Sequence, residues 1–208
     1  MFGMPENGYC GQTDELVRIG ETMKVLLTSA GLETEEIKEY FVNMIGKNMS
    51  SVKALFIPTA AIDAGAIEVL PKCMRDLLKC GIQDQNIKVY DLHIGMNLDE
   101  LRQFDVVYLC GGDPAYLLER INATGFHTTL MAYIQADGAV IGVSAGSLIF
   151  SNNLPDSLGL INTKLDVHCA EGEQKGKVAY PLKNNLRLTN TCALAISGIP
   201  DGLEIVGT

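Results

Sequence analysis

Short apolar runs alternate with amphipathic patterns along most of this chain, and this alternation limits the possible folds more than any other feature of the sequence. Most of the apolar runs close on glycine, proline or other small residues, and the apolar residues between two runs recur at the three-to-four-residue spacing of a helix. Continuous apolar strands that alternate with helices are typical of a parallel sheet covered on both faces. We therefore expect an α/β fold, a three-layer sandwich around a mostly parallel sheet.

The position of each run predicts the individual elements. Strands are expected at residues 24–31 (with a closing small-residue turn), 54–58, 87–90, 105–110 and 139–143. Helices are expected at residues 33–48, 66–79, 98–101, 114–122 and 128–135. Asp113 is the expected N-cap of the fourth helix, with Pro114 in its first turn. Residues 193–197 and 203–206 are joined by a turn with glycine and proline, and they predict a small C-terminal β hairpin.

Residues 1–22 differ from the rest of the chain. They carry turn formers and only a weak apolar pattern, whereas Met23 directly precedes the first strand. Doubly wound domains often begin with such a strand, and 208 residues is the size of one domain. We expect residues 1–22 to be an N-terminal extension that is not part of the native protein, and residues 23–208 to form a single α/β domain.

Charge and cysteine content narrow the classes of partner. The net charge is −9, so we expect no nucleic-acid or anionic-membrane surface, because either would need a basic patch. No apolar run reaches the ~18 residues that a membrane span requires, and the six cysteines form no CxxC pair. We therefore expect a cytoplasmic protein with reduced thiols, no metal and no cofactor, which is a monomer or a homodimer.

The sequence Gly142-Val143-Ser144-Ala145-Gly146 leaves the fifth expected strand and enters an apolar, helix-like run. This is the G-x-S-x-G pattern of a nucleophile elbow, in which a sharp turn pushes the serine hydroxyl outward. The flanking glycines relieve crowding at such a turn. The pattern predicts Ser144 as a nucleophile; the alternative is a small-residue turn that lets strand and helix pack closely.

A second strand end carries adjacent glycines, Gly111 and Gly112. Their backbone N–H groups can approach a ligand closely, so they suit an oxyanion hole completed by the N–H of Ala145. The alternative is a tight strand-to-helix turn. Phosphate binding is disfavoured, because neither the G-x-G-x-x-G nor the G-x-x-x-x-G-K-[ST] pattern is present.

A serine nucleophile needs a base, and the chain has three histidines, His93, His127 and His168. His93 follows the third expected strand, and His127 lies at the start of a helix. His168 is favoured because it alone follows the elbow, in the irregular stretch near the carboxyl edge of the expected sheet.

Two segments resemble the peptidase E (aspartyl dipeptidase) family of serine peptidases, which also contains cyanophycinase. They are Gly-Gly-Asp-Pro-Ala-Tyr-Leu-Leu at 111–118 and Gly-Val-Ser-Ala-Gly-Ser at 142–147, and the resemblance extends through the strand order from Met23 to about Val206. It implies a class I glutamine-amidotransferase-like (flavodoxin-like) sandwich and not an α/β-hydrolase fold. The residues before Met23 have no counterpart in the family.

The resemblance also implies roles for individual residues. Ser144 becomes the nucleophile, His168 the base, and the 111–112 turn with the Ala145 N–H the oxyanion hole. Members of the family often supply an acidic residue from a longer segment between serine and histidine. That segment is short here, and Asp156 is the best-placed candidate. Three further acids compete with it: Asp166, Glu171 and Glu173.

The expected function is hydrolysis of short peptides through an acyl-enzyme on Ser144, as in a dipeptidase whose small peptide substrate has an acidic N-terminal residue. The segment that would read the substrate does not align, so we expect any acidic preference to be weak. Two other functions remain open. One is an esterase, although the HGGG run of lipases is absent. The other is a non-catalytic member of the same fold that binds a small ligand at the strand ends.

Overall fold

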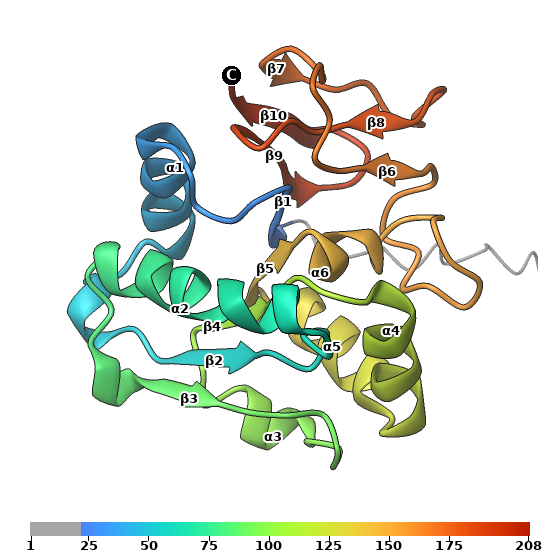
Figure 1. Cartoon of the computed structure of the whole chain (residues 1–208). Coiled ribbons are helices and arrows are strands. Elements are labelled where there is room, and N and C mark those ends of the chain that lie inside the picture. Colours follow the sequence, from blue (N-terminus) through green and yellow to red (C-terminus); the bar gives the residue numbers. More distant parts are fainter. Residues whose placement is uncertain (1–21) are drawn as a thin grey trace, which may run out of the picture.

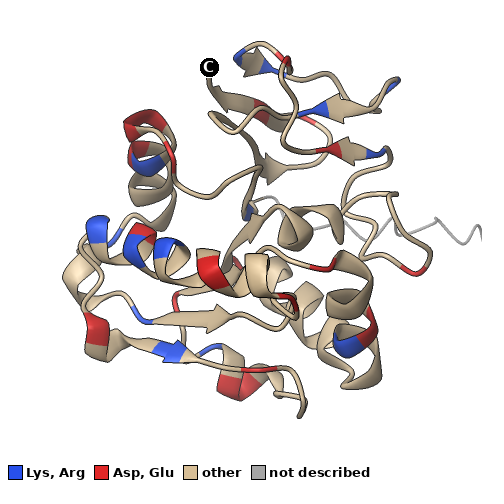
Figure 2. Ribbon diagram, in the orientation of Figure 1, with Lys and Arg blue, Asp and Glu red and all other residues tan. Residues whose placement is uncertain are grey.

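The computed structural model describes residues 22–208 (Figure 1). The expected N-terminal extension at 1–22 lies outside the described residues except for Thr22, whose hydroxyl donates a hydrogen bond to Asp137. Within the described part of the chain, no helix has both the length and the apolar character needed to cross a membrane. Lysine and arginine are interspersed with aspartate and glutamate along the ribbon (Figure 2).

In the described part of the chain, eight strands form the main sheet, and the five that follow the predicted apolar runs pair in parallel. Their order is β3 (Ile87–Val89), β2 (Ala54–Ile57), β4 (Val106–Leu109), β5 (Ala139–Val143), β1 (Lys24–Thr28), β9 (Cys192–Gly198), β10 (Gly202–Gly207) and β7 (Gly176–Lys177). Strands β9, β10 and β7 pair antiparallel. The expected α/β class and the C-terminal hairpin are confirmed. The hairpin β9–β10 extends the main sheet beside β1.

Helices cover both faces of this sheet, which makes three layers (Figure 1). One face, with Leu26, Phe56 and Tyr108, packs against α1 (Glu35–Ile45) and α2 (Ala64–Lys79). The other face packs against α3 (Leu98–Leu101), α4 (Pro114–Ala123) and α5 (Phe126–Gln135). Side chains of a strand alternate between the two cores, because successive Cβ atoms point to opposite faces.

Side-chain caps mark the start of helices α1 to α4, and the cap that the sequence predicts is the one on α4. The Asp113 carboxylate accepts hydrogen bonds from the N–H groups of Ala115 and Tyr116 at 2.8 and 2.9 Å, and Pro114 occupies the first turn of α4. Such caps satisfy backbone N–H groups that have no partner within the helix. Two short 3₁₀ turns connect other elements, η1 (Met49–Ser51) and η2 (Asp84–Asn86).

The chain becomes irregular after α6 (Ala145–Leu148). Within this stretch β6 (Leu165–Asp166) pairs in parallel with β8 (Leu186–Arg187) as a separate two-stranded sheet. Leu165 and Leu186 are buried in the core on the side of the sheet that holds α4 and α5. This small sheet therefore fixes the residues that follow β6, including His168.

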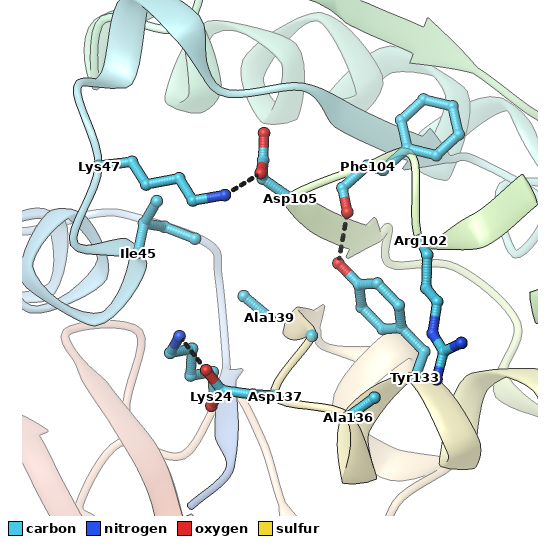
Figure 3. Close-up of a pocket in the computed structure, with 11 residues that line it drawn as sticks. Lys24, Ile45, Lys47, Arg102, Phe104, Asp105, Tyr133, Ala136, Asp137 and Ala139 are labelled. Atoms are coloured by element: carbon cyan, nitrogen blue, oxygen red, sulfur yellow. Dashed lines mark hydrogen bonds and ion pairs between the residues drawn. The ribbon is translucent and has the colours of Figure 1, made fainter. Parts of the chain in front are cut away.

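The amino-terminal edge of the main sheet has its own cavity, of about 250 Å³ (Figure 3). Ion pairs line it: Lys24 Nζ lies 2.5 Å from Asp137 Oδ2, and Lys47 Nζ lies 2.6 Å from Asp105 Oδ1. Asp105 also accepts the backbone N–H of Lys53 at 2.8 Å. Partial burial acts to raise the pKa of Asp105, but the hydrogen bonds from Lys47 and Lys53 outweigh it and lower that pKa.

Asp105→Asn is therefore expected to lower the free energy of unfolding by roughly 1 kcal/mol at pH 7. Because the folded-state pKa of Asp105 is lowered, its contribution is present above the unfolded pKa of ~3.9 and is lost as the pH falls through the folded pKa. Urea unfolding of wild type and variant at pH 7 and in acid checks this. Asp99→Asn is the control, because Asp99 is exposed and lies 4.0 Å from Arg102. An effect of Asp105→Asn that is equal at both pH values would mean that the charge of Asp105 does not contribute to stability.

Candidate active site

Three strand ends converge at the opposite, carboxyl-terminal edge of the sheet. Strands β4, β5 and β1 are neighbours and parallel, so the residues that follow them lie at one edge: Gly111 after Cys110, Ser144 after β5, and Ser29 after β1. Ligand sites of open α/β sheets form at this edge. The two turns singled out from the sequence are thus adjacent in space.

The turn at Ser144 has the geometry of an elbow. Ser144 has φ 48° and ψ −108°, values that an L residue rarely adopts, and it is the N-cap residue of α6. A Cβ on Gly142 would lie 2.4 Å from the carbonyl oxygen of Gly146, and a Cβ on Gly146 would lie 2.4 Å from that of Leu109. Both flanking positions of the G-x-S-x-G pattern therefore require glycine.

His168 faces the serine from the stretch after β6. Its Nε2 lies 3.0 Å from the hydroxyl oxygen of Ser144. His168 has a left-handed φ of 56°, and its backbone N–H donates to the hydroxyl of Ser29 at 2.6 Å. The next residue, Cys169, donates its N–H to the carbonyl of Leu188, the residue after β8. These contacts hold the imidazole over Ser144.

Asn190 holds the other side of the imidazole, with its Oδ1 2.8 Å from His168 Nδ1. Because the Ser29 hydroxyl accepts the backbone N–H of His168, it donates its own proton to Asn190 Oδ1, at 3.1 Å. Oδ1 then serves as acceptor for Nδ1–H as well. This chain of hydrogen bonds favours the tautomer whose Nε2 lone pair faces the Ser144 hydroxyl.

The structure corrects the expectation that Asp156 orients the histidine. Asp156 lies on an exposed turn after α6, and its carbonyl oxygen accepts a hydrogen bond from the side chain of Asn122 on α4. Among residues 22–208, the hydrogen-bond partners of the His168 ring are Ser144, Asn190 and Ser29. The competing acids Asp166, Glu171 and Glu173 are not among them. The neutral amide of Asn190 occupies the place expected for a carboxylate.

Asn190 was not expected from the sequence, because the candidates for the third residue were all acidic and lay between residues 156 and 173. Asn190 instead precedes β9, which runs antiparallel to β1 with Ala193 opposite Thr28. The start of an antiparallel strand lies at the same edge as the end of its partner. The sequence feature that could have pointed to Asn190 is the predicted C-terminal hairpin. Because its first strand, β9, pairs with β1, the residues just before β9 lie at the site.

The amides expected to form an oxyanion hole lie next to Ser144. A Cβ on Gly111 would lie 3.3 Å from the Cβ of Ser144, so the two backbones are in close contact. Gly112 has φ 140°, and a Cβ there would lie 2.0 Å from the carbonyl oxygen of Ala60, so glycine is required. Within the described chain the N–H groups of Gly111 and Gly112 donate no hydrogen bond, and Ala145 is the first residue of α6.

A cavity of about 340 Å³ opens beside Ser144 and His168. It is lined by the strand-end loops and one face of α2: Ser29, Ala30, Glu33, Gly65, Ala66, Val69, Leu70, Lys72, Cys73, Gly111, Gly112, Val143, Ser144 and His168. Among the residues that the structure describes, no three His, Cys, Asp or Glu side chains are grouped closely enough to hold a metal ion.

Asn190→Leu, which keeps the approximate volume but removes the acceptor, is expected to lower kcat by roughly 10²-fold, because the imidazole loses its fixed orientation. Asn190→Asp is expected to remain active. Its carboxylate can still accept the hydrogen bond from His168 Nδ1–H, so kcat should stay within about 10-fold of wild type. Steady-state kinetics of the three proteins checks this. An Asn190→Leu variant with wild-type kcat would show that the contact is incidental.

The arrangement of Ser144, His168 and the strand-end amides places the chain among α/β proteins built like serine hydrolases. The sequence model of peptidase family S51 matches residues 25–163, more than half of the chain, so the chain belongs to this family. The predicted resemblance to peptidase E is confirmed at this level. His168 and Asn190 lie beyond the matched segment.

Individual relatives agree with this assignment. An uncharacterized peptidase of Listeria monocytogenes is 27% identical over 130 residues, which cover 62% of this chain and 61% of the relative. One from Pasteurella multocida is 24% identical over 119 residues, covering 57% of each chain. The match therefore spans about three fifths of the length of these relatives.

Two solved structures share the fold. A candidate peptidase E protein from Listeria monocytogenes superposes with a TM-score of 0.68 at 21% identity, over 90% of this chain and 99% of the other. A peptidase from an acI-B1 actinobacterium gives 0.60 at 16% identity, over 91% and 89%. These matches confirm the expected sandwich architecture.

Proposed function

We propose that this chain is a serine peptidase that hydrolyses short peptides through an acyl-enzyme on Ser144. The observation that carries the proposal is the 3.0 Å contact between Ser144 Oγ and His168 Nε2, with the imidazole held from behind by Asn190. A nucleophile, a base and a group that orients the base form one proton-transfer unit. Membership of family S51 supports the same reaction class.

Each step of the reaction has a residue to perform it. Ser144 Oγ attacks the peptide carbonyl carbon while its proton moves to His168 Nε2. The carbonyl oxygen becomes an oxyanion, which the amides of Gly111, Gly112 and Ala145 would bind. The C–N bond then breaks, and the imidazolium gives its proton to the leaving amine. A water, deprotonated by the same histidine, then attacks the acyl-enzyme carbonyl; the ester C–O bond breaks, and His168 returns the proton to Ser144 Oγ as the acid leaves.

The side chain of Asn190 is neutral, so it orients the imidazolium but does not balance its positive charge. An aspartate in this position would stabilise the imidazolium by charge as well. The proposed mechanism therefore relies on the oxyanion amides and on the fixed tautomer more than on charge stabilisation of the histidine. The cavity of about 340 Å³ suits a short peptide.

A screen of a dipeptide library tests the proposal, with amino-acid release followed by mass spectrometry and Ser144→Ala as the control. We expect release from a subset of dipeptides by wild type and none above background by the variant. Short-chain acyl esters form the second arm. Hydrolysis of the esters but of none of the dipeptides would favour an esterase. Hydrolysis of neither would favour a non-catalytic protein that binds a small ligand.

A further inference from the structure

One face of α2 forms the wall of the cavity opposite the strand-end loops. Residues Gly65, Ala66, Val69, Leu70 and Cys73 line it. Their spacing of three and four places them on the same side of the helix. With the exception of Lys72, the α2 residues that line the cavity have small or apolar side chains. The same cavity is lined by Ser144, Gly111 and Gly112.

Part of this wall is exposed to solvent, so a ligand can cover it. The side chain of Val69 is 48% exposed and Leu70 is half-buried. Removal of apolar surface from water stabilises a complex by about 25 cal/mol per Å². An aliphatic side chain of a bound peptide would gain this contribution at Val69 and Leu70, whereas a carboxylate would lose water there without a partner.

Among residues 22–208, the ammonium group that lines the cavity is that of Lys72, and it is already paired with a carboxylate. Lys72 Nζ lies 2.6 Å from Glu33 Oε1 and donates to the carbonyl oxygen of Ala30 at 2.8 Å. The Glu33 carboxylate therefore already balances the charge of Lys72, and because Glu33 also lines the cavity it would repel an acidic substrate side chain. Basic and acidic residues both occur on α2 (Figure 2), so the helix presents no uniformly basic surface.

We infer that the α2 wall, centred on Val69 and Leu70, is a specificity site that selects an aliphatic side chain next to the scissile bond. This inference rests on the proposed peptidase function and assigns its substrate class. The expected substrates are dipeptides with leucine, valine or a similar residue, in preference to those with aspartate, whose side chain has nearly the shape of leucine but is charged.

The test compares matched dipeptides that differ only by leucine or aspartate, first in one position and then in the other. We expect kcat/KM for the leucine peptide to exceed that for the aspartate peptide by about 10-fold or more in at least one position. Val69→Asp should lower kcat/KM for the leucine peptide by about 10- to 100-fold, mainly through KM. Ile67→Asp is the matched control: Ile67 is 52% exposed on α2 but does not line the cavity, so kcat/KM should change less than about twofold.

Phosphonate reagents separate this inference from the peptidase proposal. Ser144 is labelled with two fluorophosphonates of similar shape, one with an aliphatic tail and one with a carboxylate. If peptides are not cleaved but the aliphatic reagent labels Ser144 faster, and Val69→Asp removes the difference, the peptidase proposal fails and the apolar site stands. Equal labelling rates, a preference for aspartate peptides, or equal effects of Val69→Asp and Ile67→Asp would overturn the inference. Failure of both turnover and labelling would overturn both claims.

Discussion

Ser144→Ala is expected to lower kcat on the best dipeptide by several powers of ten. Alanine cannot form the acyl-enzyme, so only substrate binding and the oxyanion amides would remain, worth roughly 10³-fold over the reaction in water. The melting temperature should stay close to that of wild type. The hydroxyl of Ser144 contributes one side-chain hydrogen bond, to His168, while the backbone N–H of residue 144 keeps its bond to Thr28.

Steady-state kinetics with a thermal unfolding control measures this effect. A variant that retains more than about a tenth of wild-type activity would have lost less than ~1.4 kcal/mol of transition-state stabilisation. Ser144 would then not be the nucleophile. A folded, inactive variant that still binds the peptide product would separate a chemical defect from a defect in binding.

His168→Ala is expected to be about as severe as Ser144→Ala. Without the imidazole, no group among residues 22–208 remains within hydrogen-bond distance of Ser144 Oγ to take its proton. The two residues act as one unit, so the double variant should be no slower than either single variant. The backbone N–H of residue 168 still donates to Ser29, which should keep the loop in place.

The double-mutant cycle is the informative measurement for His168. The two residues are fully coupled if adding the second substitution to the first lowers kcat no further. Additive losses, each of several powers of ten, would mean that the two residues act in separate steps. A His168→Ala variant with nearly full activity would remove His168 from the mechanism.

The strands and helices were predictable because burial leaves a direct pattern in the sequence. Strands β1, β4 and β5 are almost wholly buried, and they appear as unbroken apolar runs. Helix ends were less predictable. The fifth helix begins at Phe126 and not at the expected Thr128, because Phe126 is fully buried against the sheet and extends the helix by packing.

The serine side of the site was also visible in the sequence, because its chemistry depends on local backbone geometry. Gly142 and Gly146 flank Ser144 for steric reasons that a short motif records. The histidine side depends on tertiary pairing. His168 and Asn190 come together only through the β6–β8 pair and the position of β9 beside β1. No local spacing encodes that contact, so Asp156 was the residue expected in place of Asn190.

Covalent labelling measures directly whether His168 activates Ser144 as a nucleophile. The wild-type protein is incubated with a fluorophosphonate, and the adduct is located by peptide mapping and mass spectrometry. We expect one adduct per chain, on Ser144, with a labelling rate that falls by at least about 100-fold in His168→Ala because the serine loses its base. An adduct on a different residue, or labelling of Ser144 at the wild-type rate in His168→Ala, would contradict this expectation.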